Sequence, residues 1–295
     1  MKQIGKEIQG IIPPIVTPFD ENGGINYELL ESEMDICLNA GVDGISVSGS
    51  TGEGPTIRDD EIDKLVRIAR KHTGDKPVVC GIMRTCTRDA VKAGKIAKEA
   101  GADAIMVTPP AYNVLVPNAQ GMFDFYSTIS AEVKLPIIIY NVIPQNKILP
   151  DLFDRLLNET EYVRGVKQSV DGIQALYAQL MKVGNRGYVF AATDDMIFSC
   201  FELGAAGAIS AILSVFPEEC VKMWKYAKEG KHEEGLALQN SLYDAWQSLG
   251  GNQFPIRLKY ALECRGRHVG YCRSPITYLP EEDKRKIEKA FNTMK

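Results

Sequence analysis

The sequence predicts a parallel (β/α)8 TIM barrel in residues 1–213, followed by a C-terminal helical extension in residues 214–295 that packs on the barrel. Three observations support this fold: the chain has 295 residues, short apolar segments alternate with amphipathic ones, and no GxGxxG motif follows the first apolar segment. The length suits one α/β barrel with additions. The missing motif argues against an open, doubly wound dinucleotide-binding sheet.

One unit recurs along the chain: a helix ends in Ala-Gly or Leu-Gly, and a strand rich in Ile, Val and Ala follows after a short turn. Three copies are clear, at residues 39–50, 99–110 and 202–213. In each copy the glycine suits the left-handed position that ends a helix. The apolar run suits a strand that is buried on both faces, as in parallel barrels.

The complete pattern predicts eight strands with helices between them. The strands are expected at residues 10–16, 43–48, 77–82, 103–108, 136–141, 162–167, 187–192 and 206–211. The barrel helices are expected at residues 26–40, 58–72, 87–100, 119–133, 150–159, 171–182 and 194–203. No disordered linker precedes the extension, whose helices are expected at residues 216–230, 231–249, 253–264 and 280–294.

Composition and charge exclude several classes of protein. The net charge of −4 and the lack of a lysine and arginine stripe argue against nucleic-acid partners and anionic membranes. The sequence has no apolar run of about 20 residues and no hydrophobic leader at its start, so we expect a cytoplasmic protein. Seven cysteines without a CxxC pair, and three histidines remote from the strand ends, indicate neither a disulfide framework nor a metal site.

Function in such a barrel lies at the carboxyl ends of the strands, where this sequence is rich in hydroxyl groups. Lys167 ends the apolar segment 162–167. A strand-end lysine alone most often extends to solvent or pairs with a carboxylate. In a dry pocket, burial instead favours the uncharged amine, which attacks a ketone carbonyl and forms a Schiff base.

Two neighbouring features support this chemistry. Tyr140 ends the preceding strand, so its phenol is expected beside Lys167, where it can transfer protons. As an isolated feature it would be an ordinary buried tyrosine. The segment GSTGE, residues 49–53, combines a tight glycine turn with Ser50 and Thr51, whose hydroxyl and N–H groups can hold a carboxylate. The alternative is a glycine turn that caps a helix.

Three further residues are candidates for substrate contacts. Thr193 and Asp194 follow the seventh strand and suit hydrogen bonds to a polyol, although acidic residues in a first helical turn also interact with the helix dipole. Arg84 follows the third strand. It is either a cation for a distal carboxylate of the substrate or the partner of a surface acid.

Five motifs occur in order along the predicted barrel: GSTGE, VTPPAYN, a Tyr-Asn-Val segment followed by proline, GVK and GAIS. In this arrangement the chain resembles the dihydrodipicolinate synthase/N-acetylneuraminate lyase family of class I aldolases, from about residue 10 to its end. The resemblance implies a Schiff base between Lys167 and pyruvate or another 2-oxo acid, with an aldehyde as the second substrate. It also implies that no metal or organic cofactor takes part, and that the protein is a homotetramer built as a dimer of dimers.

The resemblance also implies roles for individual residues. Tyr140 is the implied proton shuttle, and Ser50, which is also taken as catalytic, holds the pyruvyl carboxylate together with Thr51. Tyr112, in PPAYN, is implied to complete a hydroxyl relay from a neighbouring subunit. Ile209, in GAIS, matches the position whose backbone faces the bound keto acid.

The sequence departs from the family pattern at two places. Lysine-pathway synthases carry a segment of the type Tyr-Asn-x-Pro-x-Arg-Thr, whose arginine receives the carboxylate of the second substrate. Here Pro144 comes one residue later and is followed by Gln145 and Asn146, without an arginine. Sialic-acid lyases favour a serine after the Gly-Ile of the eighth strand, where this chain has Ala211.

We therefore predict a class I aldolase or lyase that reversibly joins pyruvate to an aldehyde or cleaves a 2-keto-3-deoxy sugar acid. Three alternatives use the same iminium: 4-hydroxy-tetrahydrodipicolinate synthase, N-acetylneuraminate lyase, and a 2-oxo acid dehydratase or deaminase. A barrel that binds a small acid without catalysis is an alternative of another class, but binding alone has no need of a nucleophilic amine. A metal-dependent barrel lyase is disfavoured by the histidine-poor rim.

Overall fold

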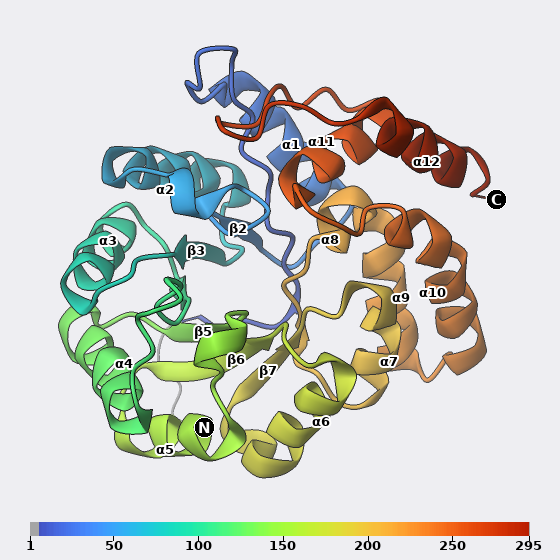
Figure 1. Ribbon diagram of the computed structural model, residues 1–295. Helices are drawn as coiled ribbons and strands as arrows, with labels where there is room; N and C mark the ends of the chain where they lie inside the picture. The colour runs from blue at the N-terminus through green and yellow to red at the C-terminus, as the bar shows by residue number, and fades with distance from the viewer. Residues whose placement is uncertain (1–5, 295) are drawn as a thin grey trace.

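A ring of helices surrounds eight parallel strands in the computed structural model, which describes residues 6–294 (Figure 1). The strands are β1 (Gly10–Ile11), β2 (Ile45–Val47), β3 (Val78–Ile82), β4 (Ala104–Val107), β5 (Ile137–Asn141), β6 (Val163–Gln168), β7 (Tyr188–Ala191) and β8 (Gly207–Ala208). They pair in the order β1-β8-β7-β6-β5-β4-β3-β2. The predicted (β/α)8 barrel is confirmed.

The segment after β1 closes the ring of strands against β2. Pro14 forms an isolated parallel bridge with Ser46, and the Ile15 N–H donates to the Ser46 carbonyl at 2.8 Å. The expected strand 10–16 is shortened to two residues. The reason is that Pro13 and Pro14 have no N–H group to donate to a ladder.

Apart from α7, the helices between the strands begin and end within two residues of the predicted segments. Those between the strands are α1 (Tyr27–Asn39), α2 (Asp59–Thr73), α3 (Thr87–Glu99), α4 (Ala119–Val133), α5 (Pro150–Glu159), α6 (Gly172–Val183) and α7 (Ile197–Glu202). The expected helix 194–203 is divided, because a 3-10 turn, η4 (Asp194–Met196), precedes α7. Side-chain caps begin two of the helices: Asn26 accepts from the Leu29 N–H before α1, and Asn118 accepts from the Gly121 N–H before α4.

The chain after β8 is helical, as predicted. It forms α8 (Ile212–Val215), α9 (Pro217–Glu229), α10 (His232–Gln247), α11 (Phe254–Cys264) and α12 (Glu281–Asn292). Helix α9 packs against α7 and β1, and so it completes the helical layer of the barrel. Helices α11 and α12 lie outside this layer, on the side of α1 and α8 (Figure 1). The division of the chain after residue 213 stays a prediction.

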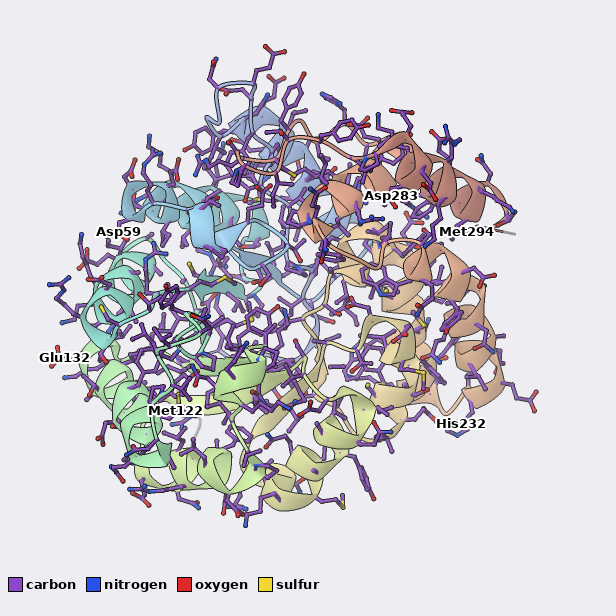
Figure 2. The ribbon with its side chains drawn as sticks, viewed as in Figure 1. Asp59, Met122, Glu132, His232, Asp283 and Met294 are labelled. Atoms are coloured by element: carbon purple, nitrogen blue, oxygen red, sulfur yellow. The ribbon has the colours of Figure 1, made fainter. Side chains whose placement is uncertain are left out.

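The interior of the barrel is apolar. A buried cluster fills it with Ile8, Ile12, Val79, Ala104, Met106, Ile138, Tyr140, Phe190 and Ile209. Side chains occupy the enclosed space, whereas Glu132 and His232 lie at the outer edge of the molecule (Figure 2). A group that projects into this interior is therefore held against a dry, close-packed wall.

Strand β3 passes close to the turn after β2, at Gly81. A Cβ atom built on Gly81 would lie only 2.2 Å from the carbonyl oxygen of Ser48. Ser48 ends β2 early because its backbone is left-handed, with φ of 57°. The contact requires glycine at position 81 and holds the start of the segment that leads to Ser50.

We expect Gly81→Ala to destabilise the protein by about 1–3 kcal/mol, as overpacking of a buried site does. Gly250→Ala is the control, because the nearest atom to a Cβ there is a carbonyl oxygen at 3.4 Å. Its effect should stay within about 0.5 kcal/mol. Urea denaturation measures both, and a G81A protein as stable as the wild type would show that the Ser48 turn shifts freely.

Candidate active site

Lys167 lies in β6, inside the barrel. In the strand register its Cα pairs with that of Tyr140 in β5 and with that of Phe190 in β7, so the three side chains belong to one layer. Lys167 is 4% exposed and Tyr140 is 5% exposed. The Lys167 Nζ lies 3.8 Å from the centroid of the Tyr140 ring. The predicted neighbours are therefore in contact.

Within residues 6–294, the Lys167 amine forms neither an ion pair nor a hydrogen bond. No carboxylate lies within ion-pair distance of its Nζ, and neither this atom nor the Tyr140 hydroxyl makes a hydrogen bond to another described residue. Lysine is seldom buried in this way, because an ammonium loses its hydration without compensation. A buried and unpaired amine is instead suited to act as a nucleophile.

Asp194 is an acidic residue near Lys167, close enough for the positive charge of the lysine to lower the pKa of its carboxyl. The Ser210 hydroxyl and the Ile212 N–H donate to Asp194 Oδ1, at 2.5 and 2.9 Å. Burial raises the pKa of the Asp194 carboxyl, although the two hydrogen bonds and the positive charge of Lys167 act in the opposite direction. The structure thus places a carboxyl group with a raised pKa near the amine.

The turn 49–53 joins β2 to the short 3-10 helix η1 (Gly54–Thr56). Thr51 is buried and Ser50 is half-buried. Gly52 and Glu53 donate their N–H groups within the turn, but those of Ser50 and Thr51 make no hydrogen bond to the described part of the chain. Two adjacent free N–H groups with two hydroxyls form a suitable site for a carboxylate.

Ile209 follows β8 and is fully buried. Its N–H donates to the Ala191 carbonyl at 3.2 Å, while its own carbonyl accepts no hydrogen bond from residues 6–294. The motif resemblance implied that the backbone of Ile209 faces the keto acid, and this role stays a prediction.

The other predicted residues occupy different environments. Tyr112 is 60% exposed, and it lies in a loop with three exposed apolar side chains. The Thr193 hydroxyl is buried without a hydrogen-bond partner. It lies beside Cys200, a thiol whose pKa is raised by burial to about 12. Arg84 donates to the Asp59 carboxylate at 3.1 Å, so of its two proposed roles the structure shows the ion pair.

Buried amides join the ends of β5 and β6 and were not predicted. Asn141 and Gln168 come directly after Tyr140 and Lys167, and their Cα atoms pair in the same register. The Asn141 amide donates to Gln168 Oε1 at 2.9 Å and accepts from the Ile148 N–H at 2.9 Å. The network fixes the two strand ends that carry the reactive groups. The available signal was an amide directly after the candidate reactive residue at the end of each of two adjacent strands.

Asn146 is a second residue that sequence reasoning missed. It is buried, and its Nδ2 donates to the carbonyls of Pro110 and Leu115, at 2.6 and 2.8 Å. These two carbonyls lie on either side of Tyr112. Asn146 therefore clamps the loop that carries this tyrosine to the loop after β5.

Within the described part of the chain, no group of three or more His, Cys, Asp and Glu side chains is arranged to hold a metal ion. No helix among residues 6–294 is long and apolar enough to cross a membrane. The groups that the structure brings together around Lys167 are its amine, the Tyr140 phenol and the Asp194 carboxyl.

A barrel with a buried, unpaired lysine beside a tyrosine defines a lyase that forms a Schiff base with its substrate. The chain belongs to the dihydrodipicolinate synthetase family, which it matches over residues 7–294. The family predicted from the motifs is confirmed.

Individual relatives resemble the chain over nearly its full length. It is 30% identical over 286 residues to 4-hydroxy-tetrahydrodipicolinate synthase of Methanococcus aeolicus, covering 96% of this chain and 98% of the relative. It resembles the crystal structure of the chloride-inhibited dihydrodipicolinate synthase of Acinetobacter baumannii complexed with pyruvate, with TM-score 0.91, 27% identity, and 97% and 98% of the two chains covered. CdNal of Clostridium difficile in complex with mannosamine is also similar, with TM-score 0.87, 26% identity, and 98% and 100% covered.

Proposed function

We propose that Lys167 forms a Schiff base with pyruvate, and that the enzyme joins pyruvate reversibly to an aldehyde or cleaves a 2-keto-3-deoxy sugar acid. One observation carries this proposal: the Lys167 amine is 4% exposed, in contact with Tyr140, and free of any carboxylate partner among the described residues. The family of the chain and the pyruvate complex of a relative support the same chemistry.

The reaction follows from the groups in the barrel. The Lys167 Nζ adds to the C2 carbonyl of pyruvate, and the resulting carbinolamine loses water to form an iminium. Loss of a proton from C3 gives an enamine, whose C3 attacks the aldehyde carbonyl. Hydrolysis of the new iminium releases the product and restores the amine. Tyr140 is the proposed acid and base for the proton transfers at the oxygen atoms.

The pyruvyl carboxylate is proposed to bind the turn after β2. The N–H groups of Ser50 and Thr51 make no hydrogen bond to residues 6–294, and charge-assisted hydrogen bonds to a carboxylate satisfy such groups well. The backbone carbonyl of Ile209, which follows β8 and accepts no hydrogen bond from the described residues, is proposed to face the keto acid.

The second substrate is proposed to be a hydroxylated aldehyde. Asn146 and Gln145 replace the arginine that receives a carboxylate in lysine-pathway synthases, and the Arg84 guanidinium is paired with Asp59. Asp194 and the unpartnered hydroxyl of Thr193 offer polar groups that suit a polyol. The names of the relatives favour a second candidate, 4-hydroxy-tetrahydrodipicolinate synthase.

We also propose a cytoplasmic homotetramer in which Tyr112 completes the hydroxyl relay of a neighbouring subunit. The loop of Tyr112 exposes Val114, Leu115 and Val116, each by 44% or more of its surface. A contiguous apolar segment of this kind is typical of a surface that a partner covers. The clamp by Asn146 holds the loop ready for this contact.

Borohydride reduction with pyruvate tests the Schiff base directly. We expect wild-type protein to gain one pyruvate-derived adduct by intact mass, located on the peptide that contains Lys167. Lys167→Ala should gain none while keeping its circular dichroism spectrum, and the exposed Lys134→Ala should behave as the wild type. A wild-type protein without an adduct would favour a barrel that only binds small acids.

We expect Tyr140→Phe to retain the adduct but to slow turnover by about 10²-fold or more, the scale of a positioned acid–base group. The measurement is the steady-state rate at saturating pyruvate. The exposed Tyr177→Phe, on α6, serves as the matched control. Turnover of the Tyr140 variant at the wild-type rate would remove this phenol from the mechanism.

A panel of aldehydes with pyruvate tests the second substrate. We expect small sugar aldehydes to be consumed faster than aspartate semialdehyde, because no described arginine is free to receive the carboxylate of the latter at this site. N-Acetylmannosamine is included to test the neuraminate lyase reaction. Preference for aspartate semialdehyde would establish the synthase instead.

A further inference from the structure

Lys259, in α11, is a second buried lysine whose environment is opposite to that of Lys167. Its Nζ lies 2.8 Å from Glu53 Oε1, and the two side chains are 4% and 3% exposed. The same Nζ donates to the Thr17 carbonyl at 2.7 Å and to the Tyr271 carbonyl. All three of its N–H donors are used, so this lysine is an anchor and not a nucleophile.

Glu53 is the last residue of the turn 49–53 and has an uncommon backbone conformation. Its φ of 57° is left-handed, a region that residues other than glycine seldom adopt. The second oxygen of its carboxylate accepts from the Arg273 N–H at 2.9 Å. Two anchors from the C-terminal part of the chain thus hold the side chain, and with it the strained backbone.

The anchored end of the turn is connected to the residues that face the substrate. The Glu53 N–H donates to the Ser50 carbonyl at 3.1 Å, and the Thr17 hydroxyl donates to the Gly52 carbonyl at 2.7 Å. These bonds involve the Glu53 N–H and the Gly52 carbonyl, at the end of the turn. The N–H groups of Ser50 and Thr51 make no hydrogen bond to the described residues. A shift of Glu53 would therefore change the orientation of the turn that carries those N–H groups.

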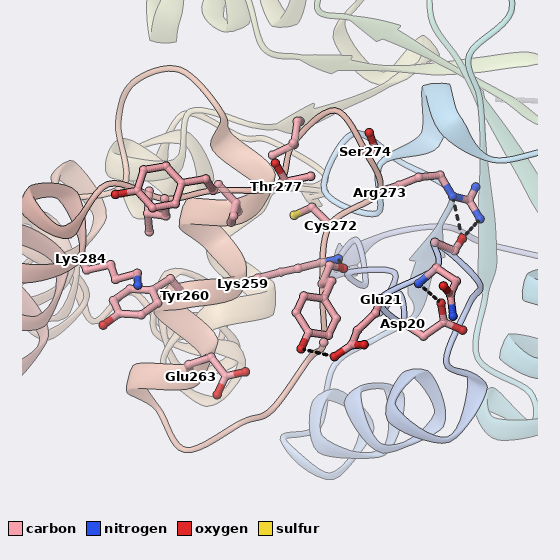
Figure 3. A pocket seen from close by; sticks show the side chains of 18 of the residues that line it. Asp20, Glu21, Lys259, Tyr260, Glu263, Cys272, Arg273, Ser274, Thr277 and Lys284 are labelled. Atoms are coloured by element: carbon pink, nitrogen blue, oxygen red, sulfur yellow. Dashed lines mark hydrogen bonds between the residues drawn. The ribbon is translucent and has the colours of Figure 1, made fainter.

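A cavity of about 710 Å³ lies beside Lys259 (Figure 3). Lys259, Cys272 and Arg273 line it. The Arg273 guanidinium is itself fixed, since it donates to the Glu61 carboxylate and to the Gly23 carbonyl. Arg273, whose N–H donates to Glu53, is thus itself held in place by α2 and by the loop before α1.

We propose that Lys259 is a positioning residue for the 2-oxo acid: through Glu53 it orients the Ser50 and Thr51 N–H groups toward the substrate carboxylate. Lys259 itself does not touch the substrate. The inference rests on the proposed function, because it assigns the carboxylate of pyruvate to this turn. It gives the C-terminal extension a part in substrate binding.

A purely structural ion pair would also be costly to break, so stability alone does not distinguish the two roles. The affinity for pyruvate does. It is read as the pyruvate concentration that half-saturates borohydride trapping, while the trapped fraction at saturating pyruvate reports the intact Lys167. Neither measurement requires the second substrate.

We expect Lys259→Met to raise the half-saturating pyruvate concentration about tenfold or more, the scale of one lost charge-assisted hydrogen bond. The trapped fraction at saturation should remain that of the wild type. Lys259→Arg, which keeps the charge, should recover part of the affinity.

The matched control is Arg267→Met. Arg267 forms another buried ion pair of the extension, with Glu33 of α1, and the two side chains are 9% and 4% exposed. Its loss should lower the melting temperature as Lys259→Met does, but leave the half-saturating concentration unchanged.

A folded Lys259→Met protein with wild-type affinity for pyruvate would overturn the inference, as would an equal loss of affinity in Arg267→Met. Should Lys259→Met not fold, the double variant Lys259→Met/Glu53→Gln leaves no unpaired charge and is expected to fold with the affinity still reduced. Wild-type protein that forms no adduct would overturn the proposed function instead, so the two failures differ.

Discussion

The site depends on one constraint: an amine that is taken out of water without an opposite charge beside it. Lys167 meets the ring of Tyr140 at 3.8 Å and projects into an apolar barrel, whereas Lys259 is equally buried but satisfied by a carboxylate and two carbonyls. The same type of side chain is thus suited to act as a nucleophile in one place and is an anchor in the other. The difference lies in what each strand or helix places around the nitrogen atom.

The barrel geometry produces the contact between the amine and the phenol. Adjacent parallel strands place paired residues on the same face, so the pairing of Tyr140 with Lys167 follows from where the two strands end. The amides of Asn141 and Gln168 then lock this register from the loop side. Reactive groups and their supports come from consecutive positions, which makes the site rigid without large side-chain movements.

Most of the fold could be predicted because its signals are local: glycine ends the helices, and apolar runs mark the strands. The contact of Lys167 with Tyr140 was predictable for the same reason. The pair of Lys259 and Glu53 was not, because 206 residues separate the partners and no pattern links them. The choice between the two roles of Arg84 likewise required the position of Asp59, and the shortened first strand required the bridge of Pro14.

The two hydrogen bonds by which Asn146 holds the loop of Tyr112 constrain how this region can change in evolution. Asn146 lies in the segment where lysine-pathway synthases carry the arginine that binds the second substrate. Here the Asn146 Nδ2 donates instead to the carbonyls of Pro110 and Leu115. A substitution of Asn146 would therefore also remove the two hydrogen bonds that hold the loop of Tyr112. In the proposed assembly this loop meets the neighbouring subunit, so a substitution of Asn146 would act on the proposed aldehyde site and on the proposed subunit contact together.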